Sequence, residues 1–400
     1  MISSNILSNK IIISDKNRYY SNNNRLIVLS IVLFSFFSIF NTARYGASFS
    51  YVALPCALII ILFLLEKKAI RARSCLIFLL FSVYLISTFI SPYVSIGSNI
   101  VTFFIFCSVY CAVVSFDYDS KSIKLIIDCY IIFAAICSLN IIYQWLTHHY
   151  YQLWVQRSSF YFFGVFKDPN YTMSYVMPAA FFSFAKLFSN KRKPIKVILL
   201  LLAIILFSLA VLATASRGAI VAFYFSCLFY FMFSNKVKIK QKIKLITLLI
   251  ILTGGLAIIA LKVLPQLAIL RFTSYTDGAG RLYLWEAAMK CFYSNPLIGG
   301  GIDSGTAFST SLVGNATHNV YIDILCDSGV IGSFLFIVFC FTNLVKSKKS
   351  NLHFQLACFI AFFVPLFFIN GFNTTSFYLP IYFLGILSNY NTKNNFNDYL

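Results

Sequence analysis

Charged residues are scarce in this chain of 400 residues. Asp, Glu, Lys and Arg together make up 11% of it, against about 25% in an average soluble protein, whereas hydrophobic residues make up 60%. So few charges cannot cover the surface of a water-soluble protein of this length. The composition therefore excludes a soluble globular protein, a disordered protein, a coiled coil and a collagen-like protein, and it indicates a polytopic membrane protein.

Residues that hold metals or form disulfide frameworks are also few or scattered. The chain has four histidines, and no cluster of His, Cys or Asp has the spacing of a metal site. Nearly all of the 11 cysteines lie inside apolar stretches, where Cys acts as a small hydrophobic residue. We therefore predict no metal, no cofactor and no disulfide-stapled fold. The polar first 25 residues show no cleaved signal peptide.

The sequence is rich in long apolar runs. A helix needs about 20 apolar residues to cross a bilayer, and continuous runs are unlike the alternating pattern of a β-barrel. We therefore predict an all-α polytopic membrane protein with about 12 transmembrane helices. Their apolar cores are 26–41, 47–65, 75–92, 100–116, 125–145, 171–188, 197–213, 218–233, 245–263, 329–345, 354–369 and 376–390.

The basic residues support this count, because cytoplasmic loops of membrane proteins collect Lys and Arg. With both termini in the cytoplasm, 24 basic residues fall on the inside and eight on the outside, and the bias alternates loop by loop. The net charge of +20 thus reflects topology, and we expect no nucleic-acid partner. The predicted organisation is nine helices over 1–263, one long ordered periplasmic loop over 264–328, and three helices over 329–400.

The long loop contains the first candidate site residues. Arg281 opens a segment in which Leu282, Trp285, Met289 and Phe292 recur at helical spacing, which predicts an amphipathic helix. An arginine in the first turn of a helix favours phosphate binding, and anchoring to a lipid headgroup is the alternative.

Two further segments have local interpretations. Residues 295–305 contain three consecutive glycines, and either a structural turn or a close approach to a ligand explains them. His318 lies just before the tenth predicted helix. A neutral imidazole there can accept a proton from a hydroxyl near pH 7, and a hydrogen-bonded structural role is the alternative.

Several short motifs then follow one another in a characteristic order. They are Asp-Pro-Asn at 168–170, Ala-Ser-Arg-Gly-Ala at 215–219, Gly-Arg and a later Trp at 280–285, Asn-Pro-Leu-Ile-Gly-Gly-Gly at 295–301, His-Asn-Val-Tyr at 318–321 and Ser-Gly-Val-Ile-Gly at 328–332. In order, spacing and membrane placement, the stretch of roughly 160–345 resembles the O-antigen ligase and O-antigen polymerase superfamily of bacterial envelopes.

The resemblance implies a GT-C-like, metal-independent glycosyltransferase that acts at the periplasmic face of the bacterial inner membrane. Its donor would be a glycan on undecaprenyl pyrophosphate. The family's pyrophosphate-binding arginines correspond to Arg217 and Arg281, with Arg271 as a plausible third. The family's loop histidine corresponds to His318, which would orient or deprotonate the acceptor hydroxyl. Further expected substrate contacts are Arg157, Asn170, Asn319 and Trp285.

The acceptor distinguishes the two activities of this superfamily. A polymerase joins repeat units to one another, and a ligase transfers the finished polymer to lipid A–core. The bias towards Ile, Asn, Lys, Phe and Tyr is typical of polymerases, so we favour a polymerase, with membrane lipid and a chain-length regulator as expected partners. A lipid-linked oligosaccharide flippase is the competing class, although it would be expected to have charges inside the bundle and short loops on both faces.

Overall fold

The computed structural model describes residues 25–42, 48–94, 97–153, 156–187, 193–233, 280–345, 352–371 and 374–389, with isolated positions between 243 and 262. Within these ranges the chain is mostly helical. Its helices are Arg25–Phe40, α2 (Ser48–Leu65), α3 (Ser74–Ile90), α4 (Ser98–Ser115), α5 (Ser120–Leu146), α6 (Pro169–Leu187), α7 (Pro194–Thr214), α8 (Arg217–Phe233), α11 (Arg281–Ser294), α12 (Ser304–Val313), α13 (Val320–Val345), α14 (Leu352–Phe363), the 3-10 helix η3 (Val364–Phe368) and α15 (Thr375–Asn389). A short hairpin, β1 (Tyr161–Phe162) and β2 (Val165–Phe166), precedes α6.

The described helices agree with the predicted apolar cores. Eleven of the 12 cores coincide with a helix, and the remaining core, 245–263, lies almost wholly outside the described residues. Four described helices are long and apolar enough to cross a membrane, namely Ser98–Ser115, Ser120–Leu146, Pro194–Thr214 and Val320–Leu344, and others are shorter. The mostly helical, polytopic architecture is thus supported, whereas the number of crossings stays a prediction.

Local sequence explains where several helices begin. The side chain of Asp119 caps α5 by accepting the Ser122 backbone N–H at 2.8 Å. Pro194 occupies the first turn of α7, where its missing N–H costs nothing. Along α5, Ile132, Ile136, Leu139 and Tyr143 are exposed at helical spacing, which is the pattern of a lipid-facing stripe.

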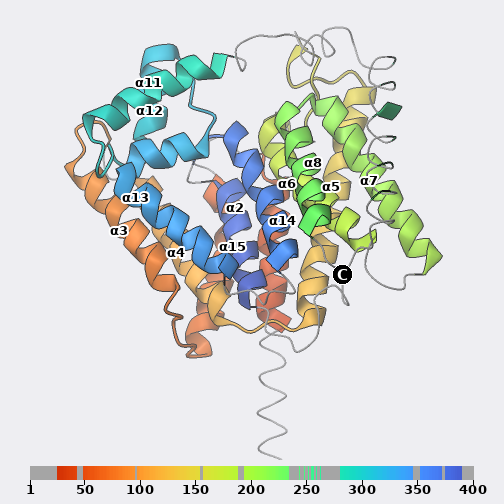
Figure 1. Cartoon of the computed structure of the whole chain (residues 1–400), viewed down its shortest axis with the longest axis horizontal. Helices are drawn as coiled ribbons and strands as arrows, with labels where there is room; N and C mark the ends of the chain where they lie inside the picture. The colour runs from red at the N-terminus through yellow and green to blue at the C-terminus, as the bar shows by residue number, and fades with distance from the viewer. Residues whose placement is uncertain are drawn as a thin grey trace, which may run out of the picture.

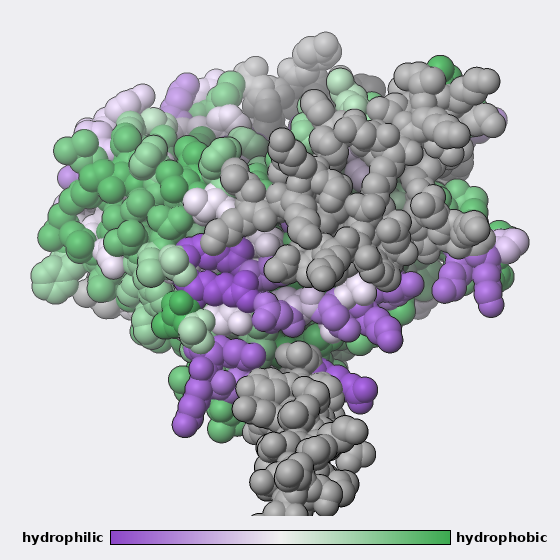
Figure 2. Space-filling view, turned by 60° about the horizontal axis from the view of Figure 1, so that its bottom comes forward, coloured by the Kyte–Doolittle hydropathy of each residue, from purple (hydrophilic) through white to green (hydrophobic). Residues whose placement is uncertain are grey.

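The two ends of the bundle carry different structures. In Figure 1, α11 and α12 lie at the top, above α3 and α13. Figure 2 shows the molecule with its bottom brought forward. Hydrophilic residues gather on this end, and hydrophobic residues cover the surface beside them. This distribution is the one expected of a bundle that crosses a bilayer.

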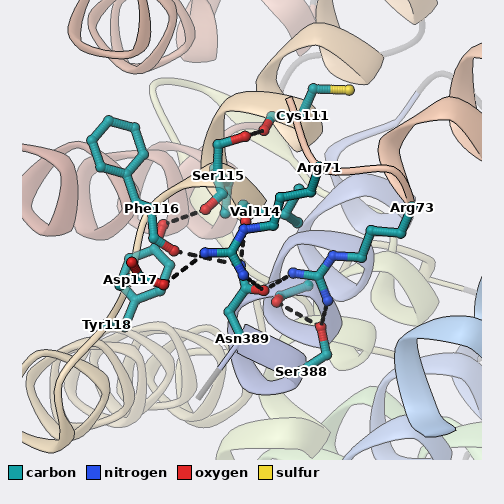
Figure 3. Close-up of polar contacts among 12 residues, drawn as sticks. Arg71, Arg73, Cys111, Val114, Ser115, Phe116, Asp117, Tyr118, Ser388 and Asn389 are labelled. Carbon is teal, nitrogen blue, oxygen red and sulfur yellow. Dashed lines mark hydrogen bonds and ion pairs between the residues drawn. The ribbon is translucent and has the colours of Figure 1, made fainter. Parts of the chain in front are cut away.

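At the end opposite α11 and α12, two arginines fasten three helices together (Figure 3). Arg71 donates to Asp117 after α4 and to Asn389 at the end of α15, each at 2.6 Å. Arg73, which is buried, donates to the side chains of Ser388 and Asn389. The loop before α3, the segment after α4 and the end of α15 therefore meet at one place.

The helix predicted to begin at Arg281 is confirmed as α11. Its predicted apolar face is wrong at one position, because Leu282 is 50% exposed while the buried side chains are those of Leu284, Ala287, Ala288 and Cys291. The helix packs against α12 and α13 through these smaller residues, with Cys291 and Cys326 in one apolar cluster. Tertiary packing has therefore rotated the buried face away from the largest side chains.

The three consecutive glycines have a structural role. The backbone N–H of Gly300 donates to the Cys326 carbonyl at 2.8 Å, and that of Gly301 donates to the Asp327 carbonyl at 3.0 Å. α13 is interrupted at Gly329, which has φ 63° and ψ −164°. A Cβ atom on Gly299, whose φ is +77°, would overlap the Asp327 backbone. Two glycine motifs thus pack backbone against backbone, which fixes the loop onto α13.

We expect Gly299→Ala to destabilise the folded protein by about 3 kcal/mol or more, since it combines left-handed backbone strain with overlap. Gly314→Ala is the matched control: Gly314 has φ +78° but open space around its Cβ position, so only strain of about 1 kcal/mol applies. Thermal unfolding of both variants in detergent measures the difference. Equal losses would show that the contact with α13 contributes nothing.

Candidate active site

A cavity of about 1030 Å³ lies between the start of α4, α12, the segment before α6 and the segment between η3 and α15. Most of the residues on its lining have polar side chains. The residues on it are Asn41, Thr42, Asn99, Thr102, Tyr151, Gln152, Phe166, Lys167, Asp168, Tyr171, Tyr175, Asp303, Thr306, Ala307, Thr310, Ser311, Asn315, His318, Asn370, Gly371, Thr374, Thr375 and Ser376. Of the residues predicted to be catalytic, His318 is on this lining.

The loop that carries His318 is held on both sides of the histidine. Trp285 of α11 donates its indole N–H to the Thr317 carbonyl at 3.1 Å, and the Thr317 hydroxyl donates to Asp323 at 2.6 Å. The Asn319 side chain accepts the Tyr321 backbone N–H at 3.0 Å and so caps α13. His318 itself has a left-handed φ of 51°, a conformation that costs energy and persists where its surroundings enforce it.

Asp323 links two parts of the cavity wall. Besides the Thr317 hydroxyl, this buried carboxylate accepts the Thr306 hydroxyl at 3.2 Å and the Gly371 backbone N–H at 3.3 Å. Thr306, Gly371 and the loop before His318 come from three separate segments. The carboxylate therefore fixes the spacing between the imidazole, α12 and the segment after η3.

Burial and two charges set the protonation of His318. Burial lowers the pKa of His318 below its usual value of 6.5; Asp168 opposes this effect and Arg281 adds to it. A lowered pKa leaves the imidazole neutral at pH 7, which is the form that accepts a proton. The same influences place His318 within electrostatic reach of both Asp168 and Arg281.

Asp168, the first residue of the Asp-Pro-Asn motif, is a cavity residue that the sequence did not single out. It caps α6, since its carboxylate accepts the Asn170 backbone N–H at 2.7 Å and the Tyr171 N–H at 3.3 Å. It also accepts the Tyr151 hydroxyl at 3.4 Å and lines the cavity. The acidic first position of the Asp-Pro-Asn motif was the only signal for this second role.

Lys167 is the other charged residue of this segment. Its ammonium donates to the carbonyls of Ser38 at 2.8 Å and Ile39 at 3.2 Å, and it lies 4.1 Å from the centroid of the Tyr175 ring. Burial lowers the pKa of Lys167 to about 7. The side chain thus ties the end of the helix Arg25–Phe40 to the wall of the cavity.

Arg281 and the start of α8 both lie at one aromatic ring, Phe368. Arg281 opens α11 and places its guanidinium carbon 5.2 Å from the centroid of that ring. Arg217 opens α8, and a Cβ atom on the next residue, Gly218, would overlap the same ring. Two helix N-termini, each with a positive dipole end, therefore lie close to this ring. Neither arginine is on the cavity lining.

The motif residues are also joined directly. The Ser216 hydroxyl donates to the Asn170 side chain at 3.2 Å, which connects the starts of α6 and α8. Arg157 is buried and donates through Nε to the Thr214 carbonyl at 2.8 Å, just before the Arg217 motif.

Asn170, Asn319, Trp285 and Arg157 each bond a protein group, which favours positioning roles for these four predicted substrate contacts. Arg271 lies outside the described residues. Among the described residues, no group of three or more His, Cys, Asp or Glu side chains is arranged to hold a metal ion.

The pH dependence of activity tests the environment of His318. Neutral imidazole is required for proton acceptance, so activity falls as pH drops through the lowered pKa, at a pH below 6.5. Asp168→Asn removes the charge that raises this pKa, so the acid limb of the pH–activity profile should move to lower pH. Arg281→Ala removes the charge that lowers it, and the limb should move to higher pH. Shifts in the same direction for both variants would contradict the assignment.

Helices of membrane-spanning character with a polar cavity at one end define a multi-pass membrane protein. Residues 177–337 match the protein family described as O-antigen ligase. Over 137 residues the chain is also 28% identical to the ComP-specific O-oligosaccharyltransferase of Acinetobacter baylyi, a match that covers 31% of this chain and 25% of that protein. The chain thus spans about a quarter of the length of that curated relative. Residues 177–337, which include Arg217, Arg281 and His318, are thus similar to the O-antigen ligase family.

Proposed function

We propose that this protein is an O-antigen polymerase, which joins undecaprenyl-pyrophosphate-linked oligosaccharide repeat units at the periplasmic face of the bacterial inner membrane. One observation carries the proposal: His318 lines a cavity of polar side chains within electrostatic reach of Arg281, and Arg281 lies over the Phe368 ring against which α8 begins. This arrangement brings a proton acceptor close to groups that bind phosphate. The match to a family of glycan-transferring enzymes supports it.

The proposed reaction is a substitution at the anomeric carbon of the donor glycan. His318 Nε2 or Nδ1 accepts the proton of an acceptor hydroxyl, and the hydroxyl oxygen forms a bond to that carbon. The bond between the carbon and the undecaprenyl pyrophosphate oxygen breaks, and the electron pair leaves with the diphosphate. The imidazolium then returns its proton to solvent or to the leaving group, which restores the enzyme.

The arginines would stabilise the charge that develops on the leaving group. Arg217 and Arg281, with Arg271 as a third, remain charged at any working pH and bind phosphate oxygens in a bidentate manner. Fixed positive groups that face developing charge supply a large part of catalysis in many enzymes. The diphosphate is already an activated leaving group, so the proposed mechanism needs no metal and no cofactor.

Two alternatives remain distinct from this proposal. A ligase is favoured by the description of the matching family, and it would use the same donor groups with lipid A–core as acceptor. A flippase is disfavoured because the imidazole and the arginine pair gather near one end of the bundle rather than along its interior.

Deletion of the gene distinguishes the three functions in the lipopolysaccharide profile. Loss of a polymerase should leave core that carries one repeat unit. Loss of a ligase should leave bare core with polymer retained on the lipid carrier, and loss of a flippase should trap single units inside the cell. Wild-type and His318→Ala genes, expressed at equal protein levels, serve as positive and negative complementation controls. Either of the latter two profiles would overturn the polymerase proposal.

We also propose that both termini are cytoplasmic and that residues 264–328 are periplasmic. Arg71 and Arg73 precede the start of α3, whereas Ser91, just after its end, donates to the Gly300 carbonyl before α12. This placement at opposite ends of α3 supports the orientation. A reporter enzyme that works only in the cytoplasm should be active when fused after position 400. One that works only in the periplasm should be inactive at the same position. A chain-length regulator is the protein partner that this function would require.

A further inference from the structure

We propose that the 1030 Å³ cavity binds the sugar part of the substrates, with the wall formed by α4 and α12 as its specificity-determining surface, and that the diphosphate lies outside it at Phe368. This inference rests on the proposed function, and it assigns the two chemically different parts of one substrate to two different places. His318 lines the cavity and is within electrostatic reach of Arg281.

The chemistry of the lining fits carbohydrate. The wall formed by α4 and α12 presents side-chain hydroxyls and amides, which can both donate hydrogen bonds to and accept them from sugar hydroxyls. The residues that present them are Asn99, Thr102, Thr306, Thr310 and Asn315. On the other side Tyr151, Phe166 and Tyr171 offer aromatic rings, whose faces suit the apolar faces of sugar rings. The volume is at the upper end of the roughly 300–1,000 Å³ typical of small-molecule sites.

The charges of the lining disfavour a diphosphate. Among the described residues on it, the charged or titratable side chains apart from tyrosines are those of Lys167, Asp168, Asp303 and His318. The two carboxylates would repel a diphosphate. The Lys167 ammonium is held by the carbonyls of Ser38 and Ile39, so it is not positioned to bind one. A neutral sugar carries no such penalty, and its hydroxyls can donate to the carboxylates.

The arginines are not on the cavity lining. Arg281 lies over Phe368, and α8 begins with Arg217 against the same ring. His318 lines the cavity and also interacts electrostatically with Arg281. An anomeric carbon held beside His318 would therefore have its sugar in the cavity and its leaving diphosphate near the arginines.

Binding of two separate probes to purified wild-type protein in detergent tests the inference. One probe is the oligosaccharide released by mild acid from the lipid-linked pool of the same cells, followed by saturation-transfer NMR. The other is radiolabelled undecaprenyl pyrophosphate without sugar. Thr310→Trp fills the α12 wall of the cavity, and Val313→Trp is the matched control, because Val313 is exposed on the same helix and is not on the lining.

We expect Thr310→Trp to weaken oligosaccharide binding at least tenfold and to leave undecaprenyl pyrophosphate binding within twofold of wild type. Val313→Trp should match wild type with both probes. Arg281→Ala should show the opposite pattern to Thr310→Trp, and inorganic pyrophosphate should not displace the oligosaccharide.

Oligosaccharide binding that is unchanged in Thr310→Trp, or displaced by pyrophosphate, would overturn the inference while leaving the proposed function intact. Oligosaccharide binding that depends on Thr310, in a protein that does not bind undecaprenyl pyrophosphate, would support the carbohydrate site and overturn the proposed donor instead.

Discussion

Replacing His318 with alanine should lower the rate of glycan transfer by about 10²–10⁴-fold, which is the usual contribution of a positioned general base. The acceptor hydroxyl would lose its proton acceptor, while the arginines at Phe368 would be untouched. Affinity for undecaprenyl pyrophosphate should therefore stay near that of wild type. The measurement is product formation per minute in proteoliposomes with purified lipid-linked repeat units, at equal amounts of folded protein.

Two variants make this result specific. His318→Gln keeps hydrogen-bonding capacity but does not accept a proton at neutral pH, so it should be as impaired as His318→Ala. His148→Ala is the matched control, because His148 lies in another loop, bonds the Tyr150 hydroxyl at 2.8 Å and is not on the cavity lining. If His318→Ala kept more than a tenth of wild-type activity, His318 would not be the base.

The second large effect concerns the arginine pair. Arg281→Ala or Arg217→Ala should each reduce transfer by about 10²–10³-fold, the range for removing one group that stabilises transition-state charge. Undecaprenyl pyrophosphate binding should weaken as well, because the ground-state diphosphate carries much of the same charge. Arg281→Lys keeps the charge but loses bidentate geometry, and it should recover only part of the activity.

A control on the same helix separates this role from general surface charge. Lys290 is an exposed basic residue of α11, and Lys290→Ala should behave as wild type. The Arg217→Ala, Arg281→Ala double variant should fall by less than the product of the two single effects, since both groups would act on one leaving group. Full diphosphate affinity in the double variant would refute the assignment.

Sequence patterns predicted helices better than they predicted contacts. The apolar cores followed from bilayer thickness, and the start of α11 followed from Gly280, Arg281 and the spacing behind them. The buried face of α11 did not follow from its largest side chains: Leu282 is half exposed, and Leu284 is buried against neighbouring helices. Which face a short helix buries depends on its partners, and a single sequence does not contain that information.

In the candidate site, too, the sequence predicted local features better than contacts between distant residues. The residue types of Arg217, Arg281 and His318 suggested their chemistry, but the ring of Phe368, which contacts Arg281 and the start of α8, is distant in sequence. Asp168 was recognisable as a cap because capping is local, whereas its place on the cavity arises from tertiary packing. The glycine run at 299–301 needed its counterpart at Gly329 before its role was apparent.

The three bonds to the Asp323 carboxylate have a consequence for how substrates reach the cavity. Because one anchor holds the histidine loop, α12 and the segment after η3, these walls cannot swing independently to admit a long glycan. In the proposed polymerase, a growing polymer would therefore pass along walls whose spacing is held by one carboxylate. The position of the glycan at each addition would then be determined by these fixed walls and not by a segment that closes over the substrate.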